Sequence, residues 1–356
     1  MFQRQTTIIV GAGCSAEYKM PVGDGLKDAI ADQLEQIGRR KRENGFTIVT
    51  SQGADDTLVG AITYEGQKFG DRNWVQIANG MAEGIRHAPS IDRYLHIHRD
   101  NPAKVKIGKL AIAWAILAAE ERSLLADGVN LAGISRSKKG EPHWLQQLFN
   151  RLQSDVPLGE IERAFDRLTI ITFNYDRLIE HYLFHAVKAL GGFDANQTAA
   201  ALSHLKIVHP YGKVGRLPWQ PDDGGPSLAF GRNENLEPQT LRDSAERLRT
   251  FTETVEEENL IGAIHDGILN PSQIIILGFS YLRQNLDLMT SEGTSKVETI
   301  EATYYQESDS NRFMADRGLR NMLRGSAKPE MGDFGTRWHN TTAGAFIRDF
   351  GNEIAS

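Results

Sequence analysis

Four short segments carry small polar or ionisable residues directly after an apolar run, and three of the four also contain glycine. The first follows Thr7–Val10 and reads Gly11-Ala12-Gly13-Cys14-Ser15-Ala16. Glycines at such a turn let backbone N–H groups approach a pyrophosphate, and the start of the next helix favours its negative charge. The spacing fits the dinucleotide fingerprint GxGxxA, although a tight turn without a ligand uses the same residues. A dehydrogenase would carry an acidic residue ~20 positions further on, but Asp32 falls in a helical pattern, which counts against hydride transfer.

The second segment, Thr172–Asp176, lies at the carboxyl end of the apolar run Leu168–Thr172. Ligands of open α/β sheets bind at that edge, so Asn174 and Asp176 are suited to hydrogen-bonding a ribose. The structural alternative is that Asn174 forms the turn and Asp176 caps the following helix.

The third and fourth segments also follow apolar runs. His209 lies after Lys206–Val208, and a histidine can accept a proton near neutral pH. Gly278, Phe279 and Ser280 follow Gln273–Leu277, where small residues allow close approach to a ribose or phosphate. The structural alternatives are that His209 has only a packing role and that Gly278–Ser280 is a buried turn without a ligand.

The apolar runs predict β-strands that are covered on both faces, because they are continuous rather than alternating. They are Thr7–Val10, Leu168–Thr172, Lys206–Val208, Gln273–Leu277 and, more weakly, Glu298–Tyr305. Helical patterns separate them, at Val105–Leu125, Tyr175–Leu190, Leu241–Ile268 and Thr342–Ile354. This alternation predicts an α/β fold with a doubly wound, mostly parallel, Rossmann-like sheet.

The domain organisation follows from the long gap between the first two strands. We predict a core formed by residues 1–23 and 166–356, with residues 24–165 as a helical insertion that caps it. Within the insertion, Phe46–Thr50 is predicted as a strand or part of a hairpin, and the basic run Arg39–Arg42 as the solvated end of a helix.

The amino-acid composition argues against several classes of function. The 356 residues include 40 Lys or Arg and 46 Asp or Glu, a net charge of -6 that argues against dedicated nucleic-acid binding. The single cysteine, Cys14, excludes an intrachain disulfide and a four-cysteine zinc site, so we expect a reducing, cytoplasmic environment. The apolar run Leu110–Ala119 is far shorter than the ~20 residues of a membrane span, and Thr6–Val10 is too short for a signal peptide, so no membrane association is expected.

Taken in order, the four segments resemble the sirtuin-like NAD-binding fold: GAGxS, TxNxD, a histidine segment ending in glycine, and LGFS. The resemblance covers Thr6–Gly23 and Leu168–Tyr305, and Ser90–Leu95 is similar to the helical insert of bacterial members. Those members are typically NAD-hydrolysing effectors of antiviral defence that a partner protein or a phage signal activates. The zinc module of protein-deacylating sirtuins has no counterpart here.

The resemblance implies roles for particular residues. Gly11, Ala12, Gly13 and Ser15 would hold the phosphates of NAD+, and Gly278, Phe279 and Ser280 would contact its adenosine side. Asn174 would lie beside the nicotinamide ribose, Asp176 would support the hydrogen-bond network, and His209 would be the catalytic base. In the usual pattern the histidine directly precedes the glycine, whereas here Tyr211 precedes Gly212, so the base is either His209 or Tyr211.

The expected reaction is hydrolysis of the nicotinamide–ribose bond of NAD+ to ADP-ribose and nicotinamide, without a metal, leading to NAD+ depletion in antiphage defence by abortive infection. The expected partners are a second copy of the chain, a second defence protein, or both. Two alternatives are a non-catalytic module that binds NAD+ or ADP-ribose, and an NAD-dependent deacylase or ADP-ribosyltransferase.

Overall fold

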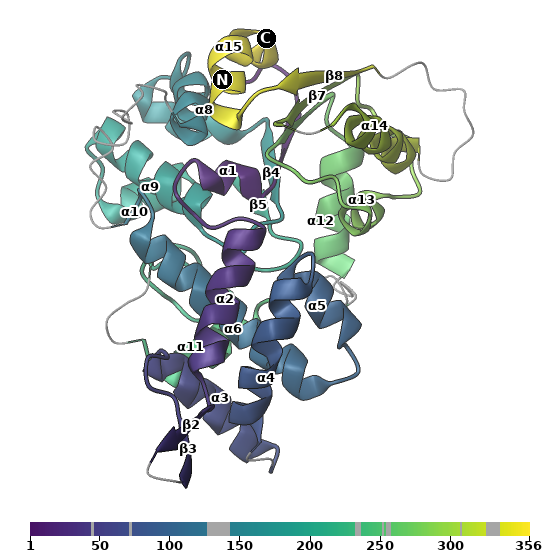
Figure 1. Cartoon of the computed structure of the whole chain (residues 1–356). Helices are drawn as coiled ribbons and strands as arrows, with labels where there is room; N and C mark the ends of the chain where they lie inside the picture. The colour runs from purple at the N-terminus through teal and green to yellow at the C-terminus, as the bar shows by residue number, and fades with distance from the viewer. Residues whose placement is uncertain are drawn as a thin grey trace.

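A six-stranded sheet in which all strands run parallel forms the centre of the molecule (Figure 1). The computed structural model describes residues 1–43, 46–70, 73–126, 143–231, 236–250, 253, 258–306, 308–324 and 335–356. The strands are β1 (Thr6–Val10), β4 (Leu168–Thr172), β5 (Lys206–Val208), β6 (Gln273–Leu277), β7 (Thr299–Tyr304) and β8 (Thr336–Asn340). The predicted doubly wound α/β fold is therefore confirmed.

The strand order is β5-β4-β1-β6-β7-β8. Numbered by appearance within this sheet, it reads 3-2-1-4-5-6, which is the order of dinucleotide-binding folds, with the direction of winding reversing between β1 and β6. The edge strand β8 was missed by the sequence analysis. Its residues are polar or half-buried because one of its sides has no neighbouring strand, so no apolar run marks it.

Helices cover both faces of the sheet, which explains why its central strands are apolar throughout. Ile8 and Val10 of β1 pack into one core with α8 (Trp144–Gln153), α9 (Leu178–Gly191) and α15 (Ala343–Ala355). Ile9 faces the opposite core, with α12 (Glu258–Leu269), α13 (Arg283–Met289) and α14 (Asp309–Arg324). The short helices α1 (Ala12–Ala16), α10 (Ala195–Ala201) and the 3-10 helix η1 (Leu158–Phe165) contribute to the first core.

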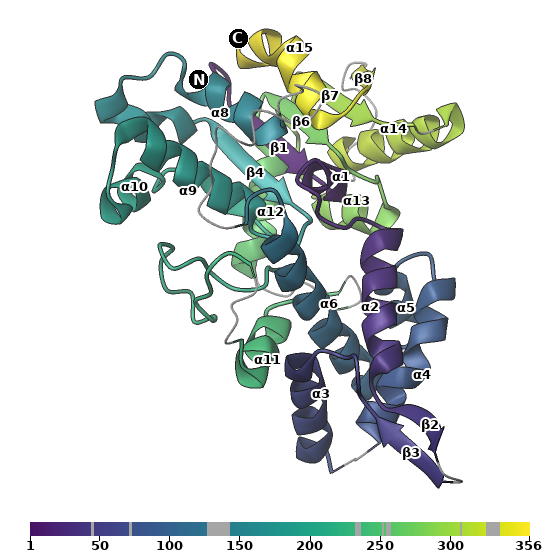
Figure 2. The same cartoon turned by 60° about the vertical axis from the view of Figure 1, so that its left-hand side comes forward.

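A second group of helices has a hydrophobic core of its own below the strand tips (Figure 2). Its members are α2 (Asp24–Gln36), α3 (Asp56–Lys68), α4 (Trp74–His87), α5 (Ile91–Ile97), α6 (Pro102–Arg122) and α11 (Pro238–Glu246). We call this group the helical unit. The predicted domain division, with an insertion at residues 24–165, stays a prediction. The hydrophobic cores follow a different grouping: α8 and η1 lie within that range but pack against the sheet, whereas α11 lies outside it and packs in the helical unit.

Two predicted elements differ from the structure. The basic run Arg39–Arg42 is not a helix end: it belongs to β2 (Arg39–Glu43), which pairs antiparallel with β3 (Phe46–Thr50), so the hairpin alternative is confirmed for Phe46–Thr50. The single helix predicted over Leu241–Ile268 is two helices, α11 and α12. The chain after α11 turns to the strand tips, where the Arg249 N–H donates to the Tyr211 carbonyl oxygen at 2.9 Å, and this contact is incompatible with a continuous helix.

Within the described ranges, none of the helices combines the length and apolar character needed to cross a membrane. The longest of them, α6, carries buried Lys109 and Glu120 along its length.

Candidate functional site

The loops after four adjacent strands, β5, β4, β1 and β6, touch one another. The Gly11 N–H donates to the Leu277 carbonyl oxygen at 2.9 Å, which joins the tips of β1 and β6. The Asn174 side-chain amide donates to the Gly11 carbonyl oxygen at 3.2 Å, which joins β4 to β1. His209 donates through Nδ1 to the Asn174 carbonyl oxygen at 3.1 Å, which joins β5 to β4. The four segments singled out from the sequence thus lie together at one edge of the sheet.

Three glycines are required by the contact between the β1 and β6 loops. A Cβ on Gly11 would lie 2.4 Å from the Gly278 carbonyl oxygen. Gly278 has φ +56°, and a Cβ there would lie 2.4 Å from the Cys14 nitrogen. The Gly13 N–H donates to the Gly278 carbonyl oxygen at 2.9 Å. Loop-to-loop packing therefore demands these glycines on its own, and a bound phosphate is not needed to explain them.

Asn174, Ser15 and Asp176 form a buried chain of hydrogen bonds. The Asn174 amide donates to Ser15 Oγ at 2.9 Å, and that hydroxyl donates to Asp176 Oδ2 at 2.8 Å. Asn174 and Asp176 are 8% and 6% exposed. Asn174 Oδ1 makes no hydrogen bond to any described residue, so this oxygen is available to a ligand.

Burial dominates the electrostatics of Asp176. Desolvation raises the pKa of its carboxyl to about 6; the nearby Glu120 and Glu180 add to the rise, while the Ser15 hydroxyl and the Leu178 N–H oppose it. The Leu178 N–H at the first residue of α9 donates to Asp176 Oδ1 at 3.2 Å. Asp176 thus accepts from the first N–H of α9 with one oxygen and from Ser15 with the other, although the N-cap position of the helix is occupied by Arg177 and not by Asp176.

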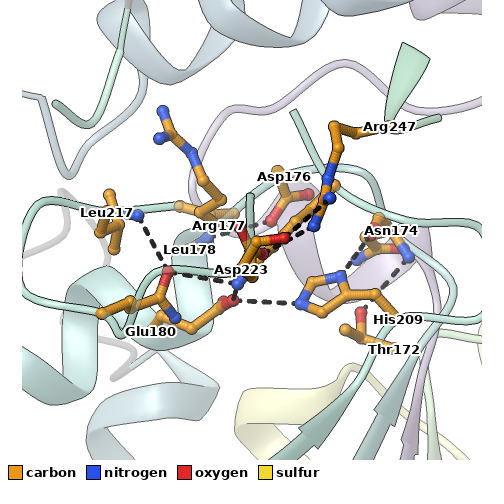
Figure 3. A network of polar contacts seen from close by, with 12 residues as sticks. Thr172, Asn174, Asp176, Arg177, Leu178, Glu180, His209, Leu217, Asp223 and Arg247 are labelled. Carbon is orange, nitrogen blue, oxygen red and sulfur yellow. Dashed lines mark hydrogen bonds and ion pairs between the residues drawn. The ribbon is translucent and has the colours of Figure 1, made fainter. Parts of the chain in front are cut away.

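His209 lies between two hydrogen-bond acceptors, as Figure 3 shows. Its Nδ1 faces the Asn174 carbonyl oxygen and its Nε2 faces Glu180 Oε1, each at 3.1 Å. Because a carbonyl and a carboxylate only accept, both hydrogen bonds require a proton on each ring nitrogen. In this arrangement neither nitrogen has a lone pair with which to take a proton from water.

Glu180 belongs to the same polar network but is not among the residues predicted from the sequence. It is 2% exposed and also accepts from Lys213 Nζ at 3.0 Å. Burial by itself would raise the pKa of this carboxyl, but Lys213 and His209 outweigh burial and hold the pKa well below its ordinary range. The available signal was a carboxylate within the apolar stripe of α9, four residues after Asp176.

Tyr211 serves as a contact between strand tips. Its hydroxyl donates to Asn285 Oδ1 of α13 at 2.7 Å, and its ring meets Phe173 edge-on with centroids 5.6 Å apart. Burial raises the pKa of the Tyr211 phenol above its ordinary value, with Asp92 adding to the rise. A phenol that holds its proton so firmly is a poor base, which disfavours the Tyr211 alternative.

The segment Ser90–Leu95 reaches this site from the helical unit. The hydroxyl of Tyr175, between Asn174 and Asp176, donates to Asp92 Oδ1 at 3.1 Å. Burial raises the pKa of the Asp92 carboxyl, although this hydrogen bond opposes the rise. The loop that carries Asn174 is thus held by the helical unit as well as by the sheet.

A cavity of about 1200 Å³ opens beside the switch point between β1 and β6. Its walls are α1, the loop after β6, the tip of β7, α13, α14 and the start of α15. Of the predicted ligand-binding residues, Ala12, Gly13, Gly278, Phe279 and Ser280 line it.

The remaining predicted residues lie behind α1. Ala12, Gly13 and Ala16 face the cavity, whereas Ser15, on the opposite side of the same short helix, faces Asn174. Gly11, Ser15, Asn174, Asp176 and His209 do not line the cavity. The structure therefore gathers all four strand tips but divides their residues between a cavity wall and a buried network.

A scan against protein-family models and a search of the curated proteins found no match to this chain. Among the described side chains, no group of three or more His, Cys, Asp or Glu is placed to hold a metal ion.

Proposed function

We propose that this chain hydrolyses the nicotinamide–ribose bond of NAD+, giving ADP-ribose and nicotinamide. The observation that carries the proposal is the joining of the β5, β4, β1 and β6 tips through Gly11, Asn174 and His209, next to a cavity at the switch point of the sheet. Dinucleotides bind at that position in doubly wound sheets. The cavity is also large enough for a cofactor, since ligand pockets commonly measure roughly 300–1,000 Å³.

In the proposed reaction, the adenosine half occupies the cavity and the nicotinamide ribose reaches the tip of β4. Cationic nicotinamide leaves without a strong acid, and the sugar passes through an oxocarbenium-like transition state, as in other glycosidic cleavages. The free Oδ1 of Asn174 orients the ribose or the attacking water, while Ser15 and Gly11 hold its amide nitrogen in place. Asp176 supports the network and favours positive charge on the sugar when it is ionised.

His209 has a positioning role in the arrangement described above. It holds the Asn174 carbonyl through Nδ1 and is fixed by Glu180 through Nε2. The general-base role that the sequence predicted would require the Glu180 contact to open. A base role predicts that His209→Gln removes one limb of the pH–rate profile, whereas a positioning role predicts a lower rate with an unchanged profile.

The direct test is to incubate the purified protein with NAD+ and measure nicotinamide by chromatography. Asn174→Ala should lower the rate by about 100-fold or more, because misplacing reacting groups is costly. The matched control is Asn270→Ala, which removes an exposed amide at the end of α12 and should leave the rate unchanged. Equal rates for wild type and Asn174→Ala would contradict the site.

The same assay addresses regulation. An enzyme that consumes cellular NAD+ must be restrained, and we propose restraint by self-association or by a second protein of an antiphage defence system in the bacterial cytoplasm. The specific activity should then change with protein concentration or on addition of the partner. A monomer with full activity at every concentration would contradict this part of the proposal.

One observation favours a second candidate, a module that binds NAD+ or ADP-ribose without turnover. Asn174 and His209 do not line the cavity, and both nitrogens of His209 are engaged within the protein. A ligand confined to the cavity would meet α1 instead of these side chains. Saturable binding of NAD+ with no release of nicotinamide, in the full assembly as well as alone, would favour this module over the enzyme.

A further inference from the structure

The cavity has an excess of positive charge that the proposed reaction does not use. Among the described residues, two carboxylates line it, and the first, Glu17, accepts from the backbone N–H groups of Trp144 and Gly344 at 2.9 and 2.8 Å. The other, Asp287, pairs with Arg283 on the same helix at 3.4 Å. Two further arginines of the lining, Arg312 and Arg317, lie five residues apart on α14.

Arg312 is placed at the tip of β7. It lies in the first turn of α14, and its guanidinium is 5.7 Å from the ring centroid of Tyr304, the last residue of β7. Its Nη2 donates to Asp309 Oδ1 at 3.2 Å, but the Asp309 side chain is 89% exposed, and such surface pairs are weak. Its Nε is buried without a hydrogen-bond partner among the described residues. Arg312 lines the cavity, and its side chain is 38% exposed, so this one weak surface pair leaves its terminal nitrogens accessible to a ligand.

The tip of β7 lies next to the loop Gly278–Ser280, because β6 and β7 are paired strands. In the proposed function, that loop contacts the adenosine side of the dinucleotide. Dinucleotide sites distinguish NAD from NADP at the adenosine ribose: a carboxylate binds the free 2′-hydroxyl, and an arginine accommodates a 2′-phosphate. Among the described residues that follow β7, Tyr305, Gln306 and Ser308 carry no carboxylate, and the carboxylate of Asp309 pairs with Arg312 itself. Arg312 also lies over the ring of Tyr304, the last residue of β7.

We infer that Arg312 makes the adenosine end of the cavity a site for a 2′-phosphate, so that NADP+ is preferred over NAD+. This inference rests on the proposed function. The bond broken is the same: water adds to the ribose carbon that nicotinamide leaves, one proton is released, and the products are nicotinamide and 2′-phospho-ADP-ribose. Arginine suits this role because its planar donors pair with two phosphate oxygens at once.

The test measures binding, which does not depend on turnover. Isothermal titration of the full chain with 2′-phospho-ADP-ribose and with ADP-ribose should give an affinity about tenfold or more higher for the phosphorylated ligand, as expected for a charge-assisted contact. Arg312→Gln should remove this difference. Arg317→Gln is the matched control: it removes the same charge from a position five residues further along α14 and should weaken both ligands equally or not at all.

Three results would overturn the inference. Equal affinities for the two ligands in the wild type would do so while leaving the proposed function intact. A preference that survives Arg312→Gln in a protein with unchanged thermal unfolding would remove Arg312 from the site. If neither ligand binds, in the protein alone or in its native assembly, the proposed function itself fails along with the inference.

Discussion

Asn174 makes contacts that few other side chains could make at the same position. Its amide nitrogen donates to Gly11 and Ser15, and its backbone carbonyl accepts from His209. An aspartate would present only acceptors to two acceptor oxygens, and a leucine would leave both unsatisfied. The side chain therefore couples the tips of β4 and β1, and the backbone carbonyl of the same residue couples β4 to β5, whether the site turns over its ligand or only binds it.

Asp176 predicts a pH dependence of stability. Its folded pKa of about 6 lies above the ~3.9 of an unfolded aspartate, so the native state keeps the proton longer. The contribution of Asp176 to the free energy of unfolding should be greatest below pH ~4 and fall as pH rises to about 6, by an amount on the order of 2–3 kcal/mol.

Urea denaturation of wild type and Asp176→Asn between pH 4 and 8 measures this effect. The asparagine does not titrate, so the difference between the two proteins isolates Asp176 from the other carboxylates, including Glu180, which contributes in the opposite direction. Parallel stability curves across this range would contradict a raised pKa at Asp176.

At the level of elements, the loop after β1 and the loop after β6 are held so close that only glycine fits between them. Gly11, Gly13 and Gly278 pack backbone to backbone, which fixes where α1 starts and so where Ser15 meets Asn174. The close packing of the two loops therefore positions the candidate site, although the glycines have no side chains that could take part in a reaction.

Gly278→Ala should therefore be strongly destabilising. The added Cβ would lie 2.4 Å from the Cys14 nitrogen, and φ +56° is unfavourable for alanine, so we expect a loss of about 2–4 kcal/mol. Thermal unfolding measures it. Gly80→Ala, in the middle of α4 with nothing within 4 Å of its Cβ position, is the control and should gain about 0.5–1 kcal/mol through helix propensity. Similar shifts for both variants would refute the close contact.

On the scale of the whole molecule, a buried ion pair joins the helical unit to the sheet. Glu120 at the end of α6 accepts from the backbone N–H, Nε and Nη2 of Arg177, which directly follows Asp176. Both side chains are 0% exposed. The Arg177 guanidinium also donates to the carbonyl oxygens of Leu228 and Ala229 at 2.8 and 2.9 Å. The position of the helical unit is thus tied to the loop that carries the site.

Glu120→Gln should cost about 3–5 kcal/mol of unfolding free energy, because it leaves the buried Arg177 without a counter-charge. Urea denaturation measures the loss. Glu160→Gln breaks an exposed pair with Arg163 and should cost less than about 1 kcal/mol. If the two variants lost the same small amount, the buried pair would not hold the two parts together.

The doubly wound sheet, five of its six strands and the segments at their tips could be predicted from the amino-acid sequence alone. The reason is local: β1 and β6 are apolar at successive positions because both of their faces are covered, and each ends in a glycine turn that is visible in the chain. The edge strand β8 lacked this signal because half of its surroundings is solvent.

Which side chains meet could not be predicted without the three-dimensional structure. Ser15 and Asp176 are 161 residues apart in the chain. His209 has two partners: Asn174 comes from the tip of another strand, and Glu180 comes from a helix. No local pattern encodes such distances, because they depend on how the strands order and how loops close over one another. Because of the same packing, Ala12 and Gly13 line the cavity, whereas Ser15 faces Asn174 on the other side of α1. Both ring nitrogens of His209, the residue predicted to be the base, are hydrogen-bonded within the protein.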